Sequence, residues 1–373
     1  MEELTALMSR TKAEPRPYQQ RIITKTLDLF CNQGLRSVLI ESPVGSGKTV
    51  MGLLIAKLLQ EKLGVRVGWV AMRRNLLAQA KAENEEKGIG AEIQYLSMFE
   101  KEPPENLDML IADEAHHDSC SSMAHIHNAV KPRFVLGLTG TPYRSDRLQL
   151  SFEKVIKDAG IATLIQDGYL STYHHYTIPK YTPEILVDFY CREPVRWGRS
   201  LAYFHTLDEC YRADALFKER GVRSDVVTGS SDRESQLEAF QAGILDVLLN
   251  CMVLSEGFNY PALQTVFARP SIRGVTVQMC GRVLRKFPAL AHKQIVQCQR
   301  THWPFPRTAP PAQQFAWTDG SWRSLQVNPK IDEVNRRVLH ALASIQTQLP
   351  KLLAGQQSRR TWRGDEGLTP PRE

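Results

Sequence analysis

The sequence predicts an α/β fold with two mainly parallel sheets, each covered by helices, and a small C-terminal appendage. Short apolar runs that suit buried strands alternate with helical patterns along most of the chain, as expected for parallel sheets. The alternation pauses after about residue 143 and resumes near residue 200, which indicates two similar units. Polar motifs follow several of the apolar runs, at the edge where such sheets bind ligands.

The first unit opens with a helical pattern and then alternates strands with helices. Arg16-Pro17-Tyr18-Gln19 precedes the first helix, and a proline near the start is a common helix signal. The apolar periodicity predicts helices over 22–30, 50–59 and 73–81. The expected strands cover residues 38–40, 65–70, 93–97, 109–112 and 134–138.

The second unit has the same architecture. Its expected helices cover residues 208–220, 232–242 and 275–284, and its expected strands cover residues 200–204, 223–227, 246–250 and 265–268. The stretch before it, 143–195, holds several prolines and a cluster of tyrosines and histidines at 169–176. We interpret that stretch as a connection with some strand content.

The texture of the chain changes after about residue 300, where prolines break regular structure. Trp303, Phe305, Trp317 and Trp322 are expected to form a small core, and 331–353 suits an amphipathic helix. The predicted organisation is a leader at 1–14, a first domain at 15–145, a connecting segment at 146–195, a second domain at 196–298, the appendage at 299–354 and a disordered polar tail at 355–373.

Composition excludes some classes of protein. Hydrophobic residues at 42% and charged residues at 23% are ordinary for a globular protein, and no apolar run approaches the roughly 20 residues that cross a bilayer. The seven cysteines are scattered without CxxC spacing, which favours a reducing cytoplasm and argues against a structural zinc site. The net charge of +7 gives mild support to a polyanionic partner.

The glycine-rich stretch between the strand at 38–40 and the helix at 50–59 is predicted to bind phosphate. Glycines let backbone N–H groups close around phosphate oxygens, and the helix N-terminus adds partial positive charge. Lys48 would reach the β- and γ-phosphates and the Thr49 hydroxyl would bind Mg²⁺, although Ser42 stands where the strict pattern has glycine. The predicted nucleotide-binding residues of this loop are Pro43, Val44, Gly45, Ser46, Gly47, Lys48 and Thr49.

Two adjacent carboxylates, Asp113 and Glu114, follow the expected strand at 109–112. Phosphoryl transfer to water needs one carboxylate for Mg²⁺ and another to orient or deprotonate the attacking water. We therefore assign Asp113 to the metal and Glu114 to the catalytic base. The alternative is a solvated acidic turn, which the preceding strand and the phosphate loop disfavour.

In order along the chain, the motifs GSGKT, DEAH, LTGTP and QMCGRVLR (278–285) resemble those of superfamily 2 helicases of the DEAD/DEAH-like branch. The resemblance covers about residues 16–290. It implies tandem RecA-like domains that bind ATP and Mg²⁺ between them. The region after the last motif is similar to the short tails of bacteriophage-encoded members, so a bacterial or phage-infected host cytoplasm is the expected location.

The resemblance also assigns roles to single residues at the ATP site. Gln19 would read the adenine edge, with Tyr18 and Arg16 packed on or near the base. Asn259 would bind a ribose hydroxyl, although many relatives have aspartate there. The remaining residues that the resemblance assigns to the nucleotide are His116, Gly257, Gln278, Arg282 and Arg285.

Arg282 and Arg285 match the arginines of the last motif. The transferred γ-phosphoryl group develops negative charge that one domain cannot surround, and an arginine from a second domain supplies permanently charged donors. These two residues are therefore predicted to be catalytic together with Lys48 and Glu114. The alternative is a basic helix end that stabilises the helix dipole.

The resemblance further implies a nucleic-acid track, bound mainly through phosphates. Thr139 and Thr141 would couple the ATP site to this track. The residues expected to contact nucleic acid are Arg73, Gln79, Ser97, Thr228, Gly229 and Ser255.

We accordingly predict an ATP-dependent helicase or translocase that moves on single-stranded or branched DNA rather than RNA. The alternatives are a translocase without strand separation, such as a branch-migration enzyme or a restriction-type motor that needs a protein partner for specificity, and a nucleotide-gated binding protein with little turnover. A metabolic kinase would need an acceptor site, and none is visible.

Overall fold

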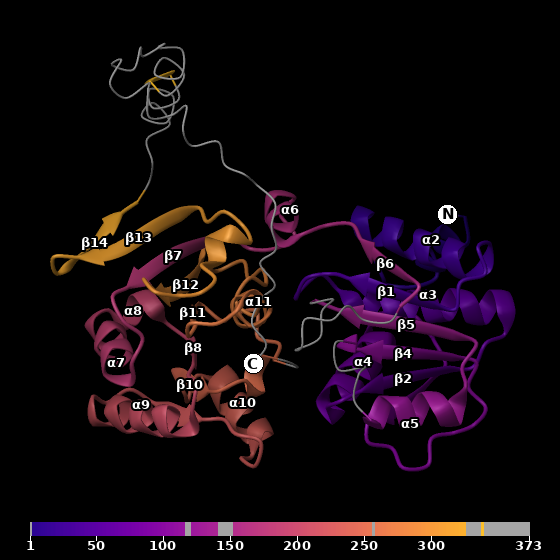
Figure 1. Ribbon diagram of the computed structural model, residues 1–373, viewed down its shortest axis with the longest axis horizontal. Helices are drawn as coiled ribbons and strands as arrows, with labels where there is room; N and C mark the ends of the chain where they lie inside the picture. The colour runs from indigo at the N-terminus through magenta and orange to yellow at the C-terminus, as the bar shows by residue number, and fades with distance from the viewer. Residues whose placement is uncertain (1, 116–120, 141–151, 256–257, 326–336, 339–373) are drawn as a thin grey trace, which may run out of the picture. The chain divides into compact units, whose positions relative to one another are not determined.

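The computed structural model describes residues 2–115, 121–140, 152–255, 258–325 and 337–338. Within them the chain forms two sheets flanked by helices (Figure 1), and this confirms the predicted fold class. The expected helix at 331–353 and the tail at 355–373 lie almost entirely outside the described residues.

The first sheet has six parallel strands in the order β3-β2-β4-β5-β1-β6. Register aligns the carboxyl ends of its strands, with Glu41 opposite Thr139, Asp113 opposite Leu138 and Ala71 opposite Ser97. The strands are β1 (Ser37–Glu41), β2 (Val67–Ala71), β3 (Ile93–Ser97), β4 (Met109–Asp113), β5 (Phe134–Thr139) and β6 (Lys154–Lys157).

Helices cover both faces of this sheet because its strands are apolar on both sides. In β1, Val38 and Ile40 pack into the core shared with α1 (Glu2–Met8), α2 (Pro17–Cys31), α3 (Lys48–Leu63) and α4 (Arg74–Glu86). Leu39 faces the opposite core, which contains Met123 and Ile126 of α5 (Ser121–Val130). A continuous apolar run is the expected signature of a strand buried on both faces.

The second sheet has eight strands in the order β14-β13-β7-β12-β11-β8-β10-β9, and every pairing except β13 with β14 is parallel. The strands are β7 (Tyr173–Ile178), β8 (Ser200–Tyr203), β9 (Ser224–Val226), β10 (Val247–Asn250), β11 (Thr265–Phe267), β12 (Lys293–Cys298), β13 (Gln313–Thr318) and β14 (Ser321–Ser324).

The helices of the second sheet also divide between its faces. Leu201 of β8 shares a core with α10 (Arg233–Ala242) and α11 (Arg273–Gly281), whereas Ala202 faces the core that contains α7 (Pro183–Arg192), α8 (Pro194–Trp197) and α9 (Leu207–Glu219). The shorter helices are α6 (Ile161–Gln166), η2 (Val253–Ser255) and η3 (Phe305–Arg307).

The leader and the connecting segment both contribute regular elements to the fold. The segment expected to be a polar leader forms α1, which buries Leu4 and Leu7. The connecting segment has the strand content that the sequence indicated: it supplies β6 to the first sheet and β7 to the second, and β7 begins within the aromatic cluster at 169–176. Helix α1 was not predicted because it is too short for periodicity to define it.

The aromatic residues of the appendage pack against the second sheet rather than on one another alone. Trp322 lies 5.0 Å from the Tyr176 ring and its Nε1–H donates to Glu193 (2.8 Å). Phe305 is buried against Tyr173, with the ring centroids 5.3 Å apart. The four aromatic residues therefore do not form the single small core that the sequence predicted: Phe305 belongs to the core on one face of the second sheet, whereas Trp317 and Trp322 pack against the core on the other face.

No helix in the described part of the chain combines the length and the apolar character needed to cross a bilayer.

The buried His175 of β7 is expected to make the stability of the protein depend on pH. Its Nε2 lies 3.0 Å from Oε1 of Gln297, and burial lowers the pKa of the imidazole to about 4. Between this value and about 6.5 the unfolded chain binds a proton that the folded chain excludes, so stability falls as the pH drops through that window. We expect this group to remove roughly 3 kcal/mol between pH 7 and pH 4.

Chemical denaturation over this pH range tests the expectation. The slope of the unfolding free energy against pH should become shallower in His175→Gln. It should be unchanged in His125→Gln, since His125 is exposed. An unchanged slope in His175→Gln would contradict it.

Candidate active site

The predicted site residues of the first domain lie at one edge of its sheet, where the strands end. Because β1 to β5 are parallel neighbours, their carboxyl ends meet along this edge. The glycine-rich loop follows β1, Asp113 ends β4 and Thr139 ends β5. Arg73 follows β2 and Ser97 ends β3 on the outer side.

The loop backbone requires glycine at two positions. Gly45 and Gly47 have φ of +81° and +76°, a region that side chains with a Cβ rarely adopt. Helix α3 begins directly after Gly47, which has no side chain to cap the helix. The first turn of α3 therefore keeps its N–H groups and partial positive charge for an anion, as a phosphate site requires.

Serine at position 42 has a structural explanation. The hydroxyls of Ser42 and Ser46 lie 2.7 Å apart and both residues are buried. This bond satisfies two hydroxyls inside the loop, so the departure from the usual glycine does not disturb the loop.

Lys48 and Asp113 place opposite charges beneath the loop. Lys48 Nζ donates to the carbonyls of Ser42 (3.2 Å) and Pro43 (3.5 Å). Burial and the neighbouring Glu114 raise the pKa of Asp113 to about 7, and Lys48 partly offsets this. A divalent cation bound here would favour the ionised carboxylate and so offset the effects of burial and of Glu114. Thr49, the other predicted Mg²⁺ ligand, is half-buried in the first turn of α3.

Glu114 has an uncommon backbone conformation. Its φ is +53°, and its N–H donates to Oδ1 of Asp113 at 3.0 Å. A non-glycine residue in this region costs on the order of 1 kcal/mol, and such strain clusters at functional sites. The conformation fits a carboxylate whose direction matters for chemistry.

The start of α2 is tied to the loop through one carbonyl. The Tyr18 hydroxyl (2.6 Å) and Gln19 Nε2 (2.8 Å) both donate to the carbonyl oxygen of Ser46. Gln19 Oε1 accepts from the N–H of Arg16 at 2.7 Å. The residues predicted to read the base are therefore fixed directly beside the residues predicted to bind phosphate.

The end of α11 brings two arginines from the second domain to this loop. A Cβ on Gly281 would lie only 3.2 Å from Cβ of Val44. Arg282 and Arg285 donate to the carbonyl of Phe258 at 3.3 and 2.9 Å, and neither makes an ion pair with any residue that the structure describes. Burial and the charge of Arg282 lower the pKa of Arg285 to about 9. Two crowded cations fit a polyanion.

The other predicted site residues are spread over both domains. Gln278 is half-buried on α11, and Asn259 is exposed. The Thr228 hydroxyl accepts N–H bonds from Ser230 and Ser231, which shapes the turn after β9. Gln79 lies half-buried on α4, and a Cβ on Gly229 would meet open space. His116, Thr141, Gly257 and the side chain of Ser255 lie outside the described residues.

The structure adds residues that sequence reasoning missed. Burial raises the pKa of Glu83 on α4, and its charge influences both Asp113 and Arg285. Tyr169 and Leu170 follow α6 and contact residues of the site: the Tyr169 ring lies 5.6 Å from that of Tyr18. The only signal for Tyr169 was the aromatic cluster at 169–176, whose position in space the sequence does not specify.

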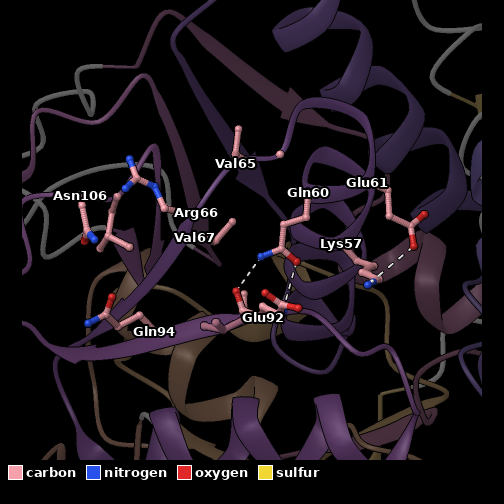
Figure 2. A pocket seen from close by; sticks show the side chains of 12 residues that line it. Lys57, Gln60, Glu61, Val65, Arg66, Val67, Glu92, Gln94 and Asn106 are labelled. Carbon is pink, nitrogen blue, oxygen red and sulfur yellow. Dashed lines mark hydrogen bonds and ion pairs between the residues drawn. The ribbon is translucent and has the colours of Figure 1, made fainter.

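A pocket of about 670 Å³ lies at the opposite edge of the first sheet, near the amino ends of β2 and β3. Figure 2 shows its lining, in which the Gln60 side chain bonds the backbone of Glu92 and Lys57 pairs with Glu61 (3.7 Å). None of the predicted site residues lines it. The pocket is therefore separate from the candidate active site, whose groups lie around the loop after β1.

Two family models match the chain. The model of the type III restriction enzyme res subunit matches residues 12–92 and 89–144, and that of the helicase conserved C-terminal domain matches residues 182–286. The boundary between the two matches falls in the segment that connects the sheets.

Curated proteins of similar sequence are longer. A 51.5 kDa protein of a Lactococcus phage is 26% identical over 274 residues, which cover 62% of this chain and 59% of that protein. The proposed ATP-dependent helicase IRC3 of Saccharomyces cerevisiae is 24% identical over 350 residues, covering 75% of this chain and 51% of that protein. The chain thus spans a little over half the length of these relatives.

Solved structures share the fold. An ATP-dependent type ISP restriction-modification enzyme, LlaBIII bound to DNA, has a TM-score of 0.59 at 17% identity, covering 78% of this chain and 28% of its own. A variant of Saccharomyces cerevisiae Dbp5 bound to RNA and ADP BeF3 has a TM-score of 0.59 at 13% identity, covering 91% and 96%. The fold is therefore that of tandem RecA-like domains.

Substitution of Gly47 tests the loop geometry. A Cβ there would lie 2.5 Å from Gln19 Nε2, an atom that is buried and already bonded to the Ser46 carbonyl. Gly47→Ala should cost about 2–4 kcal/mol of unfolding free energy, from left-handed strain and a displaced buried amide.

Gly34→Ala is the matched control, because Gly34 has φ of +72° but no atom within 4 Å of an added Cβ. It should cost only about 1 kcal/mol. Equal losses for both variants in urea denaturation would show that Gln19 does not constrain the loop.

Proposed function

Because this chain belongs to the superfamily 2 helicases, we propose that it hydrolyses ATP between its two RecA-like domains while moving along DNA. One observation carries the proposal. The close approach of Gly281 to Val44 brings Arg282 and Arg285 to the loop that holds Lys48. Phosphoryl transfer needs cationic groups on more than one side of the γ-phosphate, and this arrangement supplies them from two domains.

Each residue has a defined role in this proposal. Lys48 binds the β- and γ-phosphates, and Thr49 and Asp113 hold Mg²⁺, which neutralises phosphate charge when bound. Glu114 accepts the proton of the attacking water. Arg282 and Arg285 stabilise the charge that develops on the phosphoryl oxygens.

The two-domain arrangement links this chemistry to movement. The arginines belong to the second domain and the loop to the first, so hydrolysis requires both in contact and product release allows them to separate. A nucleic acid bound across both domains would feel each cycle as a step. The proposed coupling residues are Thr139, whose carbonyl accepts the N–H of Ser42 at 2.9 Å, and Thr141.

DNA is the proposed track for two reasons. The first domain matches the model of a restriction enzyme subunit, and the similar type ISP enzyme was solved bound to DNA. The Dbp5 neighbour was bound to RNA, so fold alone favours neither. Contacts by Arg73, Gln79, Ser97, Thr228, Gly229 and Ser255 to the backbone would carry little sequence preference.

The second candidate is a translocase that does not separate strands and depends on a protein partner for specificity. The likeness to restriction enzymes favours it, together with the larger size of the relatives that the chain matches. A duplex-unwinding assay run beside a triplex-displacement assay separates the two candidates. Displacement of a triplex strand without unwinding of a duplex would show that the protein is a translocase and not a helicase.

Polymer-stimulated ATP hydrolysis is the first test of the proposal. We expect single-stranded, duplex or branched DNA to raise steady-state turnover about tenfold or more above the level without polymer, and RNA to raise it less. Lys48→Ala supplies the blank. Turnover that depends on Lys48 but responds to no polymer would contradict the coupling of the two domains to a track.

The role of Glu114 has its own test. Glu114→Gln should lower turnover at saturating ATP by about 100-fold or more, because the amide cannot accept the proton. Its size is unchanged, so ATP affinity measured by equilibrium titration should stay within about twofold. Full turnover in this variant would remove Glu114 from the role of base.

A further inference from the structure

The segment 168–171, between α6 and β7, reaches three parts of the candidate site at once. The Arg16 guanidinium lies over the Tyr169 ring, with Cζ 4.8 Å from the ring centroid. A Cβ on Gly45 would lie 3.1 Å from Leu170. Ser171 donates its N–H to the Leu284 carbonyl (2.7 Å) and its hydroxyl to the Arg285 carbonyl (3.2 Å). We call residues 168–171 the strap.

We propose that Tyr169 is a further nucleotide-binding residue, which stacks on the purine base of the bound nucleotide together with Arg16. This inference rests on the proposed function, since it concerns the same site. It assigns to the segment between the domains a direct part in binding the base.

The position of Tyr169 supports this role. Tyr18 and Gln19, which the resemblance assigns to the base, bond the Ser46 carbonyl of the phosphate loop, and the Tyr169 ring lies next to that of Tyr18. Arg16 lies over one face of the Tyr169 ring, and both residues are half-buried, so each stays partly accessible to a ligand. A ring and a guanidinium plane are the two protein groups that stack well on a base.

Tyr18 is less suited to that contact. It is 2% exposed, and its hydroxyl is bonded to the loop, so it cannot present a ring face without leaving the core. The sequence-based expectation that Tyr18 packs on or near the base is therefore better met by Tyr169, whose ring lies against that of Tyr18.

The strap also links the bound base to the backbone near the two arginines. Two residues after Tyr169, Ser171 is hydrogen-bonded to the chain at Leu284 and Arg285. A base that fixes Tyr169 also fixes this segment, and through it the backbone that carries the arginines. Tyr169 is thus a specificity-determining residue, whereas Ser171 acts only in positioning.

Comparison of the affinities for two ligands tests the proposal. Affinities for Mg²⁺–ATP and for Mg²⁺–tripolyphosphate, which has no base, are measured on the full chain. Tyr169→Ala should weaken ATP binding about tenfold and leave tripolyphosphate within about twofold, since only ATP has a base to stack. Tyr169→Phe keeps the ring and should bind ATP as the unaltered chain does.

The outcomes separate the proposal from its premise. Equal weakening of both ligands by Tyr169→Ala, or the same loss in Tyr169→Phe, would overturn base stacking and leave a structural role. An unaltered chain that binds neither ligand through Lys48 would refute the proposed function itself. Tyr211→Ala is the control for loss of a tyrosine, because Tyr211 is 54% exposed on α9.

Discussion

The active site depends on the backbone of the loop between β1 and α3. Two left-handed glycines turn the chain so that α3 starts with uncapped N–H groups facing the edge of the sheet. The Ser46 carbonyl then receives two side-chain bonds from the start of α2. Because Gln19 occupies the space where a side chain at position 47 would lie, the residues proposed to bind the base and those proposed to bind the phosphates are packed together.

Charge around this loop is arranged for a ligand more than for stability. Asp113 is buried beside Glu114 with its pKa raised, and Arg282 and Arg285 crowd each other over one carbonyl. Burial of incompletely paired charges costs free energy in the protein alone. A polyphosphate with a divalent cation supplies the missing partners of both signs, so the same arrangement favours binding.

The two domains meet the site through short, specific contacts. The Gly281 backbone lies so close to Val44 that a side chain at position 281 would crowd Val44. Leu170 of the strap lies equally close to Gly45. These approaches explain why small residues stand at positions 45 and 281. They also place part of the connection between the domains beside the proposed ATP site.

The residues to which we assign chemistry were proposed from sequence. The loop at 43–49, the carboxylates at 113 and 114 and the arginines at 282 and 285 are short patterns whose proposed roles follow from residue type, spacing and the family resemblance.

Strand β3 was predicted with its observed bounds. The residues that contact the proposed site residues were not predicted, because contacts between segments far apart in the chain leave no periodic pattern in the sequence. Only the tertiary structure brought Tyr169 to Arg16, Glu83 near Arg285 and β13 beside β7. Local patterns specify what a side chain can do, whereas packing across the fold decides which side chains act together.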